Sequence, residues 1–103
     1  MLDALKKMLG MTTVDYAELV KQGAIILDVR SKGEYAGGHV KGSINIPVDQ
    51  LKNHLTRFPD KSKAIITCCA SGMRSGSAKS ILQSSGYQNV YNGGSWASLQ
   101  YKI

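Results

Sequence analysis

Short apolar runs alternate with segments of helical periodicity along this chain. The runs that predict β-strands are residues 24–27, 43–46, 64–67 and 90–91. The first and third are apolar at almost every position, which is typical of strands covered on both faces of a parallel sheet. We therefore expect a core built around short, buried, parallel strands.

The segments between these runs predict helices, because their apolar residues recur every three or four positions. Capping residues and glycines indicate where each helix begins and ends. The expected helices run from Thr12 or Thr13 to Gly23, from the capping-box sequence Ser31-Lys32-Gly33-Glu34 to Gly37-Gly38, from Val48 to Phe58, and from Ser75 to Ser85. Gly93-Gly94 predicts a turn into a last segment that carries Trp96 and Leu99.

Strands that alternate with helices indicate an α/β fold, with a parallel β-sheet flanked by helices on both faces. The chain has 103 residues and no internal repeat or linker, so a single domain is expected. Residues 12–103 would form this domain, and residues 1–11 an N-terminal extension that forms a short helix.

Polar and nucleophilic residues follow two of the predicted strands. Asp28 and Arg30 come directly after the first strand, and Cys69 comes just after the third. In open parallel sheets, ligands bind beyond the carboxyl ends of the strands. The sequence therefore predicts a functional site at this edge of the sheet.

Cys69 is the candidate nucleophile, because it precedes a tight polar loop and the start of a helix. Loop N–H groups, a helix N-terminus and a nearby arginine all favour thiolate over thiol. A free cysteine has a pKa of about 8.5, so a decrease of about two units would make the thiolate the major form near neutral pH. The loop residues expected to surround the sulfur are Ala70, Ser71, Gly72, Met73, Arg74 and Ser75.

The charge of the chain favours small anionic ligands over nucleic acids. The net charge is +6, but the 13 lysines and arginines are scattered and aromatic residues make up only 7% of the chain. Nucleic-acid binding is therefore not expected. A basic surface would still raise the local concentration of small anions.

The two cysteines are adjacent, which excludes a disulfide framework and favours a reducing, cytoplasmic location. No apolar run approaches the ~20 residues of a membrane span, and the first residues do not resemble a signal peptide, although a removed signal sequence would leave no trace.

Two histidines without ligand spacing predict no metal site. A monomer is expected.

Two motifs in this chain resemble those of the rhodanese family of sulfurtransferases. The first is Leu27-Asp28-Val29-Arg30, continued by Glu34-Tyr35 and by residues 38–47. The second is the loop of residues 69–75, continued by Gly86-Tyr87 and by residues 90–96. Together they extend over roughly residues 12 to 100, which is nearly the whole chain.

This resemblance implies a single rhodanese-like domain with no metal or organic cofactor. It implies that Cys69 takes the outer sulfur of a donor such as thiosulfate as a persulfide and passes it to cyanide or a thiol. Arg74 would attract the sulfonate of the donor, and the loop N–H groups would stabilise the persulfide. A partner protein in a sulfur relay is a further possible acceptor.

The remaining candidate residues are expected to have mainly structural roles. Arg30 and Glu34 are expected to form an ion pair that supports the turn after the first strand, and Asp28 to accept hydrogen bonds from loop N–H groups. Cys68 is expected to point into the core, with capture of a persulfide or sulfenic acid on Cys69 as the alternative. Met73 is expected to be exposed at the tip of the loop.

Three other functions stay open at this point. Cys68-x5-Arg74 has the spacing of a cysteine phosphatase, although no histidine precedes Cys68 and no aspartate near the loop is an obvious general acid. The domain could also be a regulatory binding module without catalysis. Finally, it could be a persulfide carrier for which thiosulfate is only a convenient donor.

Overall fold

The computed structural model describes residues 13–103, so the helix expected in residues 1–11 and a cap at Thr12 lie outside the described residues. The strands are β1 (Ile25–Asp28), β2 (Ile44–Asn45), β3 (Ile65–Cys69) and β4 (Val90–Ser95). The helices are α2 (Tyr16–Lys21), α3 (Lys32–Ala36), the 3₁₀ helix η1 (Val48–Arg57), α4 (Met73–Ser84) and α5 (Trp96–Leu99).

The strands form one parallel sheet in the order β2-β1-β3-β4. β1 and β3 are the two central strands, and β3 is buried at all five positions. Because all four strands point the same way, their carboxyl ends meet at one edge of the sheet. The predicted α/β fold is confirmed.

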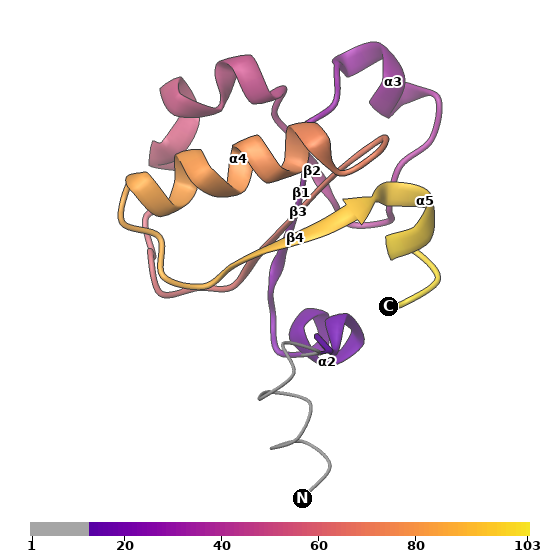
Figure 1. Ribbon diagram of the computed structural model, residues 1–103, viewed down its shortest axis with the longest axis horizontal. Coiled ribbons are helices and arrows are strands. Elements are labelled where there is room, and N and C mark those ends of the chain that lie inside the picture. Colours follow the sequence, from indigo (N-terminus) through magenta and orange to yellow (C-terminus); the bar gives the residue numbers. More distant parts are fainter. Residues whose placement is uncertain (1–12) are drawn as a thin grey trace, which may run out of the picture.

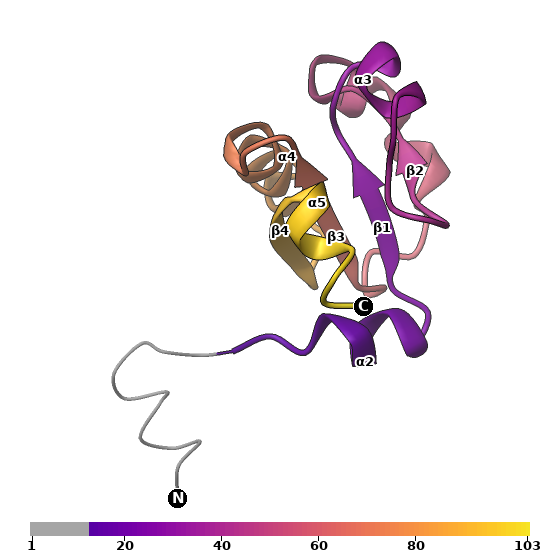
Figure 2. The ribbon, with the colours of Figure 1, turned by 90° about the vertical axis from the view of Figure 1, so that its right-hand side faces the viewer.

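Helices cover both faces of the sheet, as the apolar character of the central strands predicts. Alternate residues of a strand point to opposite faces. Ile65 faces a core that includes residues of η1 and α4, whereas Ile66 faces a second core that includes residues of α2 and α5. Figures 1 and 2 show α4 and α2 on opposite sides of the sheet.

Two expected helices differ from the structure, one in where it begins and the other in its geometry. α2 begins after an Asp15 cap, whose side chain accepts a hydrogen bond from the N–H of Glu18, rather than at Thr12 or Thr13. η1 has 3₁₀ geometry with a break at His54, where an α-helix over residues 48–58 was expected. Apolar spacing alone does not distinguish a short 3₁₀ helix from an α-helix, because both place residues three apart on one side.

Gly93 and Gly94 lie within β4, so the turn predicted there is wrong. A Cβ atom on Gly93 would lie 2.9 Å from Cγ2 of Ile66 and 2.9 Å from the carbonyl oxygen of Thr67. Glycine is therefore required at this position by the close approach of β3, not by a turn. Among the described residues, no helix is long and apolar enough to cross a membrane.

Candidate active site

The carboxyl end of β3 places the two cysteine side chains on opposite faces of the sheet. Cys69 belongs to the core beneath α4, and Cys68 to the core beneath α5. Both side chains are fully buried. The sulfur of Cys69 therefore faces the loop and the first turn of α4, where the sequence predicts the active site.

The loop after Cys69 directs hydrogen-bond donors at its sulfur. The N–H of Gly72 donates to Sγ at 2.9 Å, and the N–H of Ser75 donates at 3.4 Å. Oγ of Ser75 lies 3.4 Å from Sγ, where it can accept from the thiol or donate to the thiolate. Gly72 has a φ of +103°, a left-handed conformation that a residue with a Cβ rarely adopts. The helix α4 begins directly after Gly72, at Met73, which is two residues before the expected start at Ser75.

The pKa of Cys69 is lowered below that of a free cysteine. Burial raises this pKa, but hydrogen bonds from the hydroxyl and N–H of Ser75 and from the N–H groups of Gly72 and Ser71 lower it further than burial raises it. These donors stabilise the charged form of the sulfur. The hydrogen-bond donors of the loop therefore stabilise the thiolate form of Cys69.

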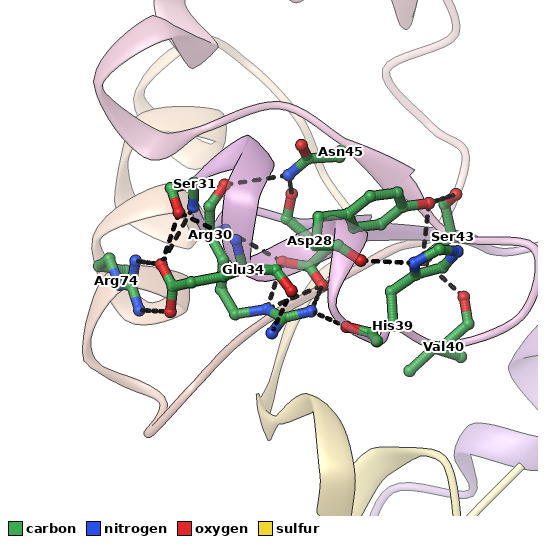
Figure 3. A network of polar contacts seen from close by, with 11 residues as sticks. Asp28, Arg30, Ser31, Glu34, His39, Val40, Ser43, Asn45 and Arg74 are labelled. Carbon is green, nitrogen blue, oxygen red and sulfur yellow. Dashed lines mark hydrogen bonds and ion pairs between the residues drawn. The ribbon is translucent and has the colours of Figure 1, made fainter.

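Arg74, in the first turn of α4 after the Cys69 loop, forms an ion pair with Glu34 of α3, as Figure 3 shows. Nη1 donates to Oε1 at 2.7 Å, and Nη2 donates to Oε2 at 3.0 Å. The side chains are 39% and 38% exposed, respectively. Hydrogen bonds from Arg74 and then from Ser31 lower the pKa of Glu34 to about 2, so its carboxylate stays charged at neutral pH. 

The predicted ion pair between Arg30 and Glu34 is wrong. Arg30 binds the carboxylate of Asp28 through Nε and Nη2, the shortest distance being 2.8 Å, and only the backbone carbonyl of Glu34 accepts from it. Residues two apart on an extended segment point the same way, which places Arg30 beside Asp28. Glu34 instead turns back to the cap of α3, where Ser31 donates to it.

Asp28 and Arg30 form a buried ion pair after β1. Asp28 accepts the N–H of Arg30 at 3.0 Å, and Arg30 also donates to the carbonyl of Gly38 at 2.6 Å. The guanidinium carbon lies 4.7 Å from the centre of the Trp96 ring. Both charged side chains are almost fully buried, so loss of either partner would leave the other charge without its partner in the interior.

A family comparison agrees with this geometry. Residues 3–98 match the family described as Rhodanese-like domain. The chain belongs to this family. Among solved structures, it resembles a rhodanese from E. coli, described as a complex with anions, with a TM-score of 0.69 and 38% identity over 73% of this chain and 89% of that one. The human single-domain sulfurtransferase TSTD1 gives a TM-score of 0.65 at 28% identity, over 76% and 83% of the two chains.

Curated relatives of this rhodanese-like domain have several names. It is 42% identical over 69 residues to the thiosulfate sulfurtransferase PspE of Escherichia coli, an alignment that covers 66% of each sequence. It is 33% identical over 81 residues to the thiosulfate:glutathione sulfurtransferase of Saccharomyces cerevisiae, covering 64% of this chain and 56% of the yeast protein. It is 32% identical over 74 residues to the tRNA uridine(34) hydroxylase of Erwinia tasmaniensis, of which only 21% is covered.

Asn92 of β4 is a site residue of this rhodanese-like domain that the sequence analysis missed. Its Oδ1 accepts from Oγ of Ser75 at 2.6 Å and from the N–H of Gly94 at 3.0 Å. Its Nδ2 donates to the carbonyl of Gly72 at 3.1 Å. One side chain thus holds Gly72 and Ser75, two of the residues whose N–H groups contact Cys69. A polar residue directly before a glycine pair at the end of a strand was the available signal, but the strand was expected to end at residue 91.

Cys68 lies in the core, as expected. It packs in a cluster with Ile26, Ile66 and Leu99, and burial, followed by the charge of Asp28, raises its pKa to about 12. The phosphatase interpretation requires Cys68 as the nucleophile inside the loop, and its position on the opposite face argues against this role. The same separation leaves no direct path for Cys68 to capture a persulfide on Cys69.

The rest of the loop is open to solvent. Ala70 and Ser71 are exposed, and Met73 is 81% exposed at the tip of the loop, as expected. No group of three His, Cys, Asp or Glu side chains that could hold a metal ion occurs within residues 13–103. The site therefore consists of one thiol, a ring of backbone donors and an ion pair at its mouth.

Replacement of Ser75 by alanine is expected to raise the pKa of Cys69. The change removes the hydroxyl donor, which is the largest of the hydrogen-bond contributions that lower this pKa. The rate of Cys69 alkylation by iodoacetamide, followed by peptide mass from pH 5 to 10, should then rise with pH around a higher midpoint. Ser80→Ala, at an exposed position of α4, is the matched control. An unchanged midpoint in Ser75→Ala would show that the backbone donors alone set the pKa.

Proposed function

We propose that this rhodanese-like domain is a sulfurtransferase that transfers sulfane sulfur through a persulfide on Cys69. The observation that carries the proposal is the set of donors around one buried sulfur, which comes from Gly72 and Ser75. These donors suit a sulfur anion, either as the free thiolate or as the persulfide. The names of the relatives in Escherichia coli and Saccharomyces cerevisiae support the same chemistry.

The reaction proceeds in two displacements. The Cys69 thiolate attacks the outer sulfur of thiosulfate, a new S–S bond forms, and the S–S bond of the donor breaks. Sulfite leaves with the bonding electron pair. A thiophilic acceptor, cyanide or a thiol, then attacks the outer sulfur of the persulfide and releases the Cys69 thiolate. Neither step consumes an oxidant or a cofactor.

Arg74 is the group proposed to contact the donor. Its guanidinium is partly exposed beside the loop, and guanidinium groups bind planar and tetrahedral oxyanions through paired N–H donors. In this proposal it contacts the sulfonate oxygens of thiosulfate. The acceptor would be a small thiol, cyanide or the cysteine of a sulfur-relay protein.

Intact-protein mass spectrometry after incubation with thiosulfate tests this function. The wild-type protein should gain the mass of one sulfur atom, and cyanide should remove that mass and yield thiocyanate. A mass gain that cyanide does not remove, such as oxidation of a cysteine to a sulfinic acid, would not be sulfane sulfur and would contradict the proposed function. No mass gain from thiosulfate or from a low-molecular-weight persulfide would contradict the proposed function.

A further inference from the structure

The ion pair between Glu34 and Arg74 joins two helices that are far apart in the sequence. Glu34 lies in α3 and Arg74 in the first turn of α4, forty positions later. Both guanidinium nitrogens at the end of Arg74 are engaged, one with each carboxylate oxygen. Arg74 is therefore not a free cation in the described structure.

Glu34 is held in place from the other side as well. It is the third residue of a capping box, so the N–H and Oγ of Ser31 both donate to its Oε1, at 3.2 and 3.0 Å. Figure 3 shows Glu34 between Ser31 and Arg74. The carboxylate of Glu34 is thus held by Ser31 independently of its contact with Arg74.

This arrangement determines the charge that an incoming donor meets. When Cys69 is a thiolate, the site carries one positive and two negative side chains, namely Arg74, Cys69 and Glu34. Thiosulfate is a dianion, so Glu34 repels it and also competes with its sulfonate for the guanidinium. A donor with fewer charges is penalised less.

We propose that Glu34 is a specificity-determining residue that weakens the binding of dianionic sulfur donors by holding Arg74 in an ion pair. This inference rests on the proposed sulfurtransferase function. It assigns the site to donors of low negative charge, such as alkyl persulfides and other donors that carry at most one negative charge. Thiosulfate is then a substrate whose binding is weakened by electrostatic repulsion from Glu34.

Glu34→Gln tests this proposal with two donors. Thiosulfate is a dianion, and benzenethiosulfonate has the same type of S–S bond but is a monoanion. Glutamine also satisfies a capping box and can still accept one hydrogen bond from Arg74, so the fold should persist. We expect kcat/KM for thiosulfate to rise roughly three- to tenfold, mainly through KM, and kcat/KM for benzenethiosulfonate to rise less. Because the ion pair is partly exposed, the difference should shrink at high salt.

Asp60→Asn is the matched control. Asp60 is exposed and accepts a hydrogen bond from Ser62. It precedes the amino end of β3, whereas the site lies at the carboxyl end of this strand. The substitution removes the same unit of charge as Glu34→Gln. Because Asp60 lies at the other end of β3, kcat/KM should change little, and equally for the two donors.

Two outcomes would overturn the proposal. Equal changes for both donors in Glu34→Gln would show that Glu34 does not discriminate by charge. A loss of kcat/KM that is larger for thiosulfate would show that Glu34 positions Arg74 for sulfonate binding instead. Failure of the wild-type protein to gain sulfur from thiosulfate, from benzenethiosulfonate and from a low-molecular-weight persulfide would reject the sulfurtransferase function itself, and this readout is separate from the donor ratio.

Discussion

Replacement of Cys69 by serine is expected to abolish sulfur transfer, lowering turnover by about a thousandfold or more. A serine hydroxyl remains protonated near neutral pH and cannot form a persulfide, so the first displacement lacks its nucleophile and the second has no persulfide for the acceptor to attack. The donors from Gly72 and Ser75 would remain in place around an oxygen that carries no charge. Thiocyanate formation from thiosulfate and cyanide measures the loss.

Cys68→Ser is the matched control for this substitution, because it makes the same atomic change one residue earlier. Cys68 is buried on the opposite face of the sheet, so its replacement should cost stability but leave the persulfide on the neighbouring cysteine. If Cys69→Ser retained turnover and Cys68→Ser lost it, the nucleophile would be Cys68 and the mechanism proposed here would be wrong.

Arg30→Met is expected to lower the free energy of unfolding by about 3–5 kcal/mol, because it leaves the Asp28 carboxylate buried without its partner. Arg30 and Asp28 have side chains that are only 5% and 0% exposed, and the guanidinium also donates to the carbonyl of Gly38. Methionine keeps much of the apolar stem but supplies no donor. Equilibrium unfolding in urea, followed by circular dichroism, measures the difference.

Lys52→Met is the control for the loss of a cationic side chain at an exposed position of η1. It should change the free energy of unfolding by no more than about 0.5 kcal/mol. If Arg30→Met cost no more than this control, water or another donor must satisfy Asp28, and the pair would not stabilise the edge of the sheet.

The strands and the loop that surrounds Cys69 were predictable because their signals are local. Ile25 to Leu27 and Ile65 to Thr67 are apolar at nearly every position, which requires cover on both faces and therefore a parallel sheet with helices on each side. Cys69 was predictable because the strand, the loop and the helix that surround it are consecutive in the chain. Backbone N–H groups supply most of its donors, and these depend on loop geometry more than on distant residues.

The partners of the charged and amide side chains depended on the three-dimensional arrangement of the chain. Sequence spacing favoured Arg30 with Glu34, but the extended backbone after β1 directs Arg30 to Asp28, and the start of α3 directs Glu34 to Arg74. Asn92 reaches the loop because β4 lies beside β3. A long side chain binds whichever partner the packing of helices and strands brings within about 3 Å, and residues forty positions apart can meet only after that packing has formed.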